Sequence, residues 1–249
     1  MDRRRQLRLW LLALDRFELT LRGQAGKARN AFVRKAAADY AVDGNLSNHV
    51  TVSHRKRVAD TLDTHYRRVI PHFAAQSLKQ VKSRRLERKA AQSLYDGLVS
   101  EWIGREALRK AQMIADTDRD DVLTAIEAGM TEGLGTAEIA SNIRKVSRLT
   151  PFRAATIART ETHAAATYGS IESVRVAERE LGVVMLKLWL PTLDTRTRPD
   201  HAAMAGSPAI PMGEKFVVGG VEMDRPGDPS APPESIIACR CALAYQEAE

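Results

Sequence analysis

A chain of 249 residues can bury one large core or two smaller ones, so its length alone does not decide the number of domains. Hydrophobic residues make up 44% of the chain and charged residues 28%, which argues against a wholly disordered protein and against a membrane-embedded one. An aromatic content of only 5% favours long helices over a large β-sandwich.

The first hundred residues are predicted to form amphipathic helices. Apolar side chains recur at helical spacing from Leu7 to Leu21, and similar stripes follow in 32–40, 58–73 and 94–103. Glycines at positions 23, 26 and 44 are expected to separate these helices. The apolar run near the start is too short to span a bilayer and makes a poor signal peptide, so we expect no membrane association.

Charge distinguishes this segment from the rest of the chain. Residues 1–100 carry 21 Lys and Arg against 9 Asp and Glu, a net charge of +12, whereas residues 101–249 carry 17 against 22, a net charge of −5. Such a basic segment favours contact with nucleic acid or with an acidic protein surface. The residues expected to make this contact are Trp10, Lys79, Lys82, Arg84, Arg85, Arg88 and Lys89.

The pattern changes near Asp116, where capping groups and acids suggest the start of a helix over 122–130. A Gly-Leu-Gly turn follows at 133–135, and a second short helix is predicted over 137–146. This outline is shared by helix-turn-helix DNA readers and by ordinary helical hairpins, and no base-reading face stands out. We therefore predict a basic helical arm over 1–114 and a second domain over 115–249.

The second domain is predicted to be α+β, with a long helix packed on a short antiparallel sheet and long loops. The helix spans 151–181, and strands are expected over 183–190 and 236–245. A hairpin, 216–218 with 221–223, is joined at Gly219-Gly220.

Glu161 falls within the alanine-rich stripe of the long helix. A buried carboxylate needs a partner, and we expect it to be Arg196, Arg198 or Arg240.

Four motifs in this domain occur together in a fixed order. They are Ile157-Ala-Arg-Thr-Glu-Thr162, Trp189 with Asp194-Thr-Arg-Thr-Arg-Pro-Asp-His201, Pro226-Gly-Asp-Pro229 and Cys239-Arg-Cys241. Over residues 115–245 the chain thereby resembles the Mu F-like family of phage head-morphogenesis proteins.

The resemblance implies a minor capsid protein without established catalysis, located in the capsid interior or at the portal vertex after assembly in the host cytoplasm. It implies the portal protein, major capsid or scaffold proteins and double-stranded DNA as partners. Since the last predicted strand ends four residues before Glu249, we expect no toxin or enzyme domain after it.

The signature residues admit three hypotheses. They are Arg159, Glu161, His163, Trp189, Asp194, Arg196, Arg198, His201, Asp228, Cys239, Arg240 and Cys241. The first hypothesis is structural: charged hydrogen bonds hold long loops on a small sheet, and no cofactor is needed.

The second hypothesis is a zinc site, because thiolate and imidazole are preferred zinc ligands. Its ligands would be His201, Cys239 and Cys241, with His163 or Asp194 as the fourth, and it could stabilise a DNA-binding module. A disulfide across one intervening residue would be strained, so both cysteines are expected to stay reduced.

The third hypothesis is a metal-dependent nuclease or a transferase acting on nucleic acid. Glu161, His163, Asp194, Arg196 and His201 could supply its acid, base and phosphate clamp.

Overall fold

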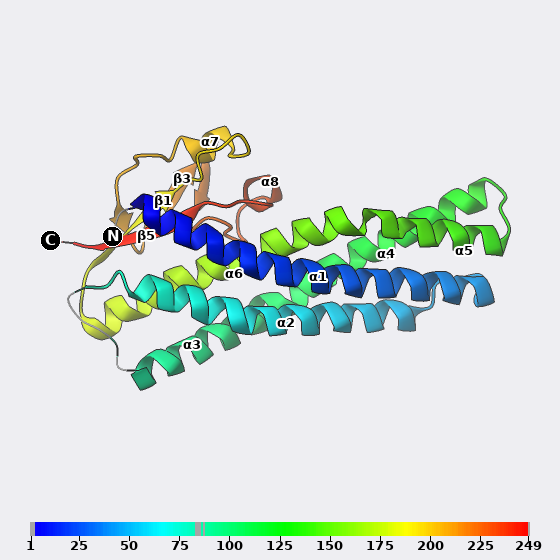
Figure 1. Cartoon of the computed structure of the whole chain (residues 1–249), viewed down its shortest axis with the longest axis horizontal. Coiled ribbons are helices and arrows are strands. Elements are labelled where there is room, and N and C mark those ends of the chain that lie inside the picture. Colours follow the sequence, from blue (N-terminus) through cyan, green and yellow to red (C-terminus); the bar gives the residue numbers. More distant parts are fainter. Residues whose placement is uncertain (1–2, 83–85, 87, 249) are drawn as a thin grey trace. The chain divides into compact units, whose positions relative to one another are not determined.

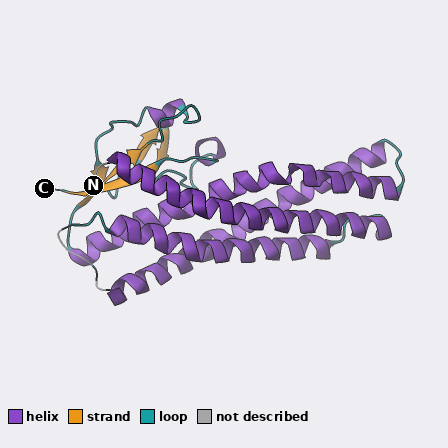
Figure 2. Ribbon diagram, in the orientation of Figure 1, coloured by secondary structure: helices purple, strands orange, loops and turns teal. Residues whose placement is uncertain are grey.

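The computed structural model describes residues 3–82, 86 and 88–248 (Figure 1). Long helices form most of it, joined to a few short strands (Figure 2). In chain order the helices are α1 (Arg3–Asp43), α2 (Asn48–Leu78), α3 (Arg88–Trp102), the π-helical turn η1 (Ile103–Ala107), α4 (Leu108–Thr131), α5 (Thr136–Lys145), the 3-10 turn η2 (Val146–Leu149) and α6 (Thr150–Leu181), with two single-turn helices, α7 (Pro199–Ala202) and α8 (Pro233–Ile236).

The strands form two small antiparallel sheets. Central strand β1 (Met185–Leu190) pairs on one side with β2 (Ile210–Pro211) and on the other with β5 (Ala242–Glu247), in the register Trp189 opposite Leu243. Strands β3 (Phe216–Val218) and β4 (Val221–Met223) form the predicted hairpin, and both glycines of its turn have positive φ, 59° and 82°. The predicted α+β class is confirmed.

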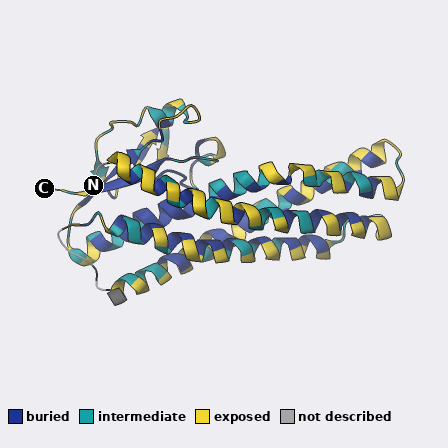
Figure 3. Cartoon of the chain, in the orientation of Figure 1, coloured by how far each residue is buried: buried dark blue, intermediate teal, exposed yellow. Residues whose placement is uncertain are grey.

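Backbone contacts divide the chain into two compact units. Unit 1 contains Met1–Glu18, His65–Trp102 and Arg159–Glu249, and unit 2 contains Leu19–Thr64 and Ile103–Ala158. Helices in both units alternate buried and exposed positions, as amphipathic segments do (Figure 3). The core of unit 1 includes Ile171, Val174, Met185, Trp189, Phe216, Met223 and Leu243, and that of unit 2 includes Phe32, Val33, Ala36, Tyr40, Val122, Ile126, Ile139 and Ile143.

This division differs from the predicted arm and domain. The predicted boundary after residue 114 falls inside the continuous helix α4, and both units draw residues from each side of it. The acids near Asp116 do not start a helix, because Asp118 lies in the middle of α4 at 1% exposure and binds Arg29. A carboxylate with a buried partner is thus compatible with the helix interior.

Two of the three expected glycine breaks are absent from the described helices. Helix α1 continues through Gly23 and Gly26, and it ends before Gly44, which has a φ of 66°. A glycine within a helix costs about 0.5–1 kcal/mol relative to alanine, which tertiary packing can offset. Among the described residues, no helix combines the length and the apolar character needed to cross a bilayer.

Candidate functional site

Glu161 lies on α6 and is buried, at 5% exposure. Its Oε2 accepts a hydrogen bond of 2.8 Å from the hydroxyl of Tyr66 on α2. The next residue, Thr162, places its hydroxyl 2.8 Å from Nε2 of His65. Arg159, just before Glu161 on α6, has its Nε 3.5 Å from a carboxylate oxygen of Glu18. The predicted burial of Glu161 is confirmed, and one of its hydrogen-bond partners is Tyr66 of α2.

The three arginines expected to pair with Glu161 bind elsewhere. Arg240 donates to both carboxylate oxygens of Asp194, at 2.7 and 2.6 Å. Arg198 donates to the carbonyl of Ile237 at 2.6 Å, and the side chain of Arg196 lies 3.8 Å from Asp194. Hydrogen bonding from Arg240 lowers the pKa of Asp194 to about 2. These contacts hold the 192–198 loop against the segment before β5, so the expected pairing was wrong in its partners.

The Pro226-Gly-Asp-Pro229 motif forms a tight turn. The Asp228 carboxylate accepts hydrogen bonds from the backbone N–H groups of Asp224 (2.8 Å) and Ser230 (3.0 Å). Although burial opposes the effect, these bonds lower the pKa of Asp228. Gly227 has a φ of 71°, and a β-carbon there would lie 2.7 Å from Nδ1 of His163. The motif therefore requires glycine both for its backbone conformation and for its closeness to α6.

His163 joins α6 to the segment before β5. Its Nε2 lies 2.7 Å from the carbonyl oxygen of Cys241 and, as the donor, fixes the tautomer. Burial lowers the pKa of His163 to about 4, so the ring is neutral near pH 7. Its role in the structure is to anchor the backbone at Cys241.

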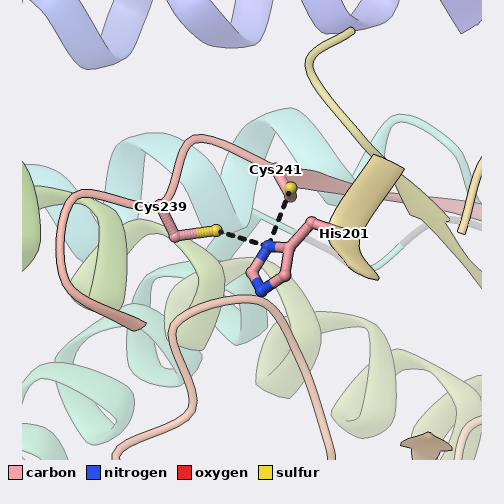
Figure 4. Close-up of side chains that lie close together, drawn as sticks. All are labelled: His201, Cys239 and Cys241. Atoms are coloured by element: carbon pink, nitrogen blue, oxygen red, sulfur yellow. Dashed lines mark hydrogen bonds between the residues drawn. The ribbon is translucent and has the colours of Figure 1, made fainter. Parts of the chain in front are cut away.

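His201, Cys239 and Cys241 form a compact group (Figure 4). His201 lies on α7, and both cysteines precede β5. Nδ1 of His201 is 3.6 Å from Sγ of Cys239 and 3.5 Å from Sγ of Cys241. All three residues are at most 3% exposed. The ring of Trp189 meets the His201 ring edge-on, with centroids 5.5 Å apart. The three predicted ligands thus come together from α7 and from the segment before β5.

The two thiols of this group influence each other. Hydrogen bonding between the side chains lowers the pKa of Cys241 and raises that of Cys239, and contact with His201 lowers the pKa of Cys241 further. Both cysteines are free, as expected from their spacing. One anionic sulfur beside a histidine nitrogen is a group suited to bind a soft cation.

The two predicted fourth ligands are engaged elsewhere. Asp194 is bound by Arg240, and His163 directs Nε2 to a carbonyl while its Nδ1 faces Gly227. Of the five groups of the enzyme hypothesis, Asp194 and Arg196 contact each other, with 3.8 Å between their side chains. Glu161, His163 and His201 each have a different contact.

A buried ionic group between β1 and α6 was not predicted from the sequence. Lys187 lies at the centre of β1 with 0% exposure, and its Nζ donates to the carboxylate of Asp224 at 2.6 Å. Arg175 of α6 donates to the same carboxylate oxygen at 2.6 Å. An unexpected lysine within an apolar strand was the available signal, because a buried ammonium group needs an anionic partner.

The predicted contact residues fare differently. Trp10 is buried at 3% exposure and packs on Phe73, with ring centroids 4.4 Å apart, so its side chain is not on the surface where the predicted contact with nucleic acid or portal would need it. Lys79 and Lys82 are exposed. Arg84 and Arg85 lie outside the described residues, as do the side chains of Arg88 and Lys89.

Comparison of the chain with known proteins identifies its family. Residues 120–244 match the family model described as Phage Mu protein F like protein, which is half of the chain. The chain belongs to this Mu F-like family. It is 34% identical over 128 residues to "Minor head protein GP7" of Bacillus phage SPP1, a match that covers 51% of this chain and 40% of that protein.

A second relative of this Mu F-like chain has the name of an enzyme. Over 141 residues, 55% of this chain and 28% of the relative, it is 29% identical to "NAD(+)--arginine ADP-ribosyltransferase EFV" of Enterococcus faecalis. The chain therefore spans less than half the length of either relative. No solved structure matches it.

Proposed function

We propose that this Mu F-like protein is a minor head protein that acts in phage head morphogenesis by binding other head components, without catalytic turnover. The supporting observation is the family match over residues 120–244 together with the 34% identity to a minor head protein. Its place would be the virion, in the capsid interior or at the portal vertex. The match to the transferase covers only 28% of that enzyme, so it lends little support to catalysis.

A groove in unit 1 is the surface best suited to this binding. It has a volume of about 800 Å³ and lies between the start of α1, the end of α2 and strand β5. Leu9 and Leu12 contribute apolar surface and are 43% and 54% exposed. Exposed leucines gathered in a concave surface are typical of protein interaction sites.

Basic side chains line the same groove. Arg3, Arg16, Lys79 and Lys82 are among its lining residues and are exposed. A groove lined by both apolar and basic side chains complements an amphipathic segment that carries acidic residues. We propose that the occupant is such an acidic segment of the portal protein, with contact to DNA as the competing possibility.

The test is binding of the full-length protein to purified portal protein and to random-sequence duplex DNA. Replacing both Leu9 and Leu12 with Glu should weaken portal binding by at least about 30-fold, since buried apolar anchors contribute about 2 kcal/mol or more. The matched control is Leu108→Glu, at a leucine on α4 that is 71% exposed and lies in unit 2. It should bind the portal as the unaltered chain does.

Salt separates the two partners. Contact with Z phosphates gives a slope near −0.9Z in a plot of log affinity against log salt concentration, whereas an apolar anchor tolerates salt. Portal binding that is unchanged by the double substitution, combined with steeply salt-dependent DNA binding, would reject the portal proposal in favour of DNA. Truncation near Asp116 would not serve in place of these substitutions, because it would cut through α4 and remove residues from both units.

A further inference from the structure

We propose that His201, Cys239 and Cys241 bind one Zn²⁺ ion, which links the loop after β1 to the segment that enters β5. This zinc site does not depend on which head component the protein binds. It rests on the positions, burial and chemistry of three side chains. The histidine is 38 and 40 residues away from the two cysteines along the chain, so the fold brings the three together.

The distances between the donor atoms fit zinc. Zinc lies about 2.3 Å from a thiolate sulfur and about 2.0 Å from an imidazole nitrogen, so tetrahedral ligands place sulfur and nitrogen about 3.5 Å apart. The observed separations from Nδ1 of His201 are 3.6 Å to Sγ of Cys239 and 3.5 Å to Sγ of Cys241. The side chains thus already have the spacing of a coordinated ion.

Hydrogen bonding explains the arrangement less well. Both sulfur atoms point to the same ring nitrogen (Figure 4), yet Nδ1 has either one proton or one lone pair. Nδ1 can therefore form only one ordinary hydrogen bond, with one of the two sulfur atoms. The contact with the other sulfur atom is not explained by a hydrogen bond. A cation between the three atoms is attracted to all of them at once.

Burial would otherwise favour an apolar explanation, because cysteine often behaves as a small hydrophobic residue. The cysteines do belong to the core of unit 1. However, a purely apolar role does not direct two thiols at the polar edge of a histidine that is itself 1% exposed. Two thiolates also balance the charge of Zn²⁺, so the occupied centre would be neutral and could be buried at low cost.

The backbone around each ligand is held in place. Arg240, between the cysteines, is bound through its side chain by Asp194, and its carbonyl accepts a hydrogen bond of 2.9 Å from Thr192. The carbonyl of Cys241 is bound by His163. Ala238, just before the first cysteine, has the unusual φ of 56° for a residue other than glycine. Such fixed positions favour binding because little ordering remains to be done.

Three protein ligands leave one zinc position open. Within the described part of the chain, no fourth His, Cys, Asp or Glu joins the group. We assign the remaining position to a water molecule. Two sulfur ligands favour Zn²⁺ over the hard cations Mg²⁺ and Ca²⁺, which prefer oxygen.

The experiment measures metal in the full-length protein, purified with a tag that contains no histidine. Elemental analysis should find one zinc ion per chain, and X-ray absorption should resolve two sulfur ligands and two nitrogen or oxygen ligands. Cobalt added to metal-free protein should produce thiolate-to-cobalt absorption. Cys239→Ser, Cys241→Ser and His201→Gln should each weaken zinc affinity by more than about 100-fold, beyond the 10–100-fold typical of residues that only support ligands.

The control is His72→Gln, at an exposed histidine of unit 1, which should keep the full zinc content. Should a serine variant fold poorly, the unaltered protein still decides the question: a mercurial that blocks thiols should release its zinc. A folded protein that contains no metal and shows no cobalt absorption would overturn the proposal. So would zinc that persists in all three ligand variants, or a bound iron–sulfur cluster.

Discussion

The two units differ in how they accommodate buried polar groups. In unit 2 a single carboxylate, Asp118, accepts hydrogen bonds from two arginines, Arg29 and, at 3.3 Å, Arg153. Nε2 of His54 lies 2.9 Å from the same carboxylate. Unit 1 also has an ionic group, in which Asp224 binds Lys187 and Arg175. In addition it contains the buried histidines His65 and His163, each within hydrogen-bond distance of an uncharged group.

This difference predicts different weaknesses. A charge network depends on every member, because the loss of one leaves opposite charges buried and unpaired. The stability that buried neutral histidines allow depends instead on pH, because protonation at low pH would place a charge in a buried site. We therefore expect the Asp118 network of unit 2 to be the most sensitive to substitution and the buried histidines of unit 1 to be the most sensitive to mild acid.

Substitution of Asp118 should have the largest effect. Asp118→Asn leaves Arg29, which is 2% exposed, without its main anionic partner, and we expect a loss of about 3–5 kcal/mol in the free energy of unfolding. Urea denaturation measures it. Asp121→Asn is the matched control, since Asp121 binds the same arginine but its side chain is 30% exposed, and it should cost about 1 kcal/mol. Equal losses for the two variants would contradict the network.

Mild acid should weaken unit 1 next. Burial, with a smaller contribution from Arg68, lowers the pKa of His65 from 6.5 to about 4. Between these values the unfolded chain binds a proton that the folded chain does not, so stability falls as the pH drops from about 6.5 to 4, by roughly 3 kcal/mol. Hydrogen bonds and ion pairs lower the pKa of Asp118, so its contribution is lost only as the pH falls below the ordinary aspartate range.

The measurement is urea denaturation at several pH values between 4 and 7. Replacing His65 with Gln should flatten this dependence, whereas His49→Gln, at an exposed histidine, should not. Because burial also lowers the pKa values of His72 and His163, part of the slope should remain. A slope that is unaltered by His65→Gln would show that this histidine takes up its proton without cost.

The turn at Gly227 gives an effect of intermediate size. Gly227→Ala forces a positive φ on alanine and places a methyl group against Nδ1 of His163. Gly182→Ala imposes a similar φ, 62°, where nothing lies within 4 Å. Gly182→Ala should lower the free energy of unfolding by about 1–2 kcal/mol, and Gly227→Ala should lower it by about 1–3 kcal/mol more, as measured by thermal unfolding. Equal losses would mean that α6 yields to the added methyl group.

Local patterns allowed much of the fold to be predicted. The bounds of α6, the Gly-Gly hairpin and the turn between α4 and α5 follow from apolar spacing and turn residues, whereas the start of α4 at Leu108 was missed. The grouping of His201, Cys239 and Cys241 was predicted from residue type, because thiolate and imidazole are the ligands that zinc prefers. The partners of Glu161 and of Asp118 did not follow, because they lie 95 and 89 residues away and their helices show ordinary apolar stripes.

Charge asymmetry was a weaker guide. The basic first hundred residues were predicted to form an arm, yet their apolar residues, such as Trp10 and Leu14, are buried in the core of unit 1. Net charge describes the surface and carries no information on which segments pack together. Among the predicted contact residues whose side chains the structure describes, Lys79 and Lys82 are exposed and line the groove.

The smallest effect is expected at Asp194, whose pairing with Arg240 lies near the proposed zinc ligands but at the surface. Its pKa is lowered to about 2 by Arg240, but its side chain is 35% exposed, so solvent screens much of this interaction. We expect Asp194→Asn to lower the free energy of unfolding by about 0.2–1 kcal/mol. Its zinc content should stay at one ion per chain, because Asp194 binds the arginine and not the metal. Loss of zinc in this variant, with Arg240→Lys retaining it, would instead identify Asp194 as the fourth ligand and replace the water molecule assigned to that position.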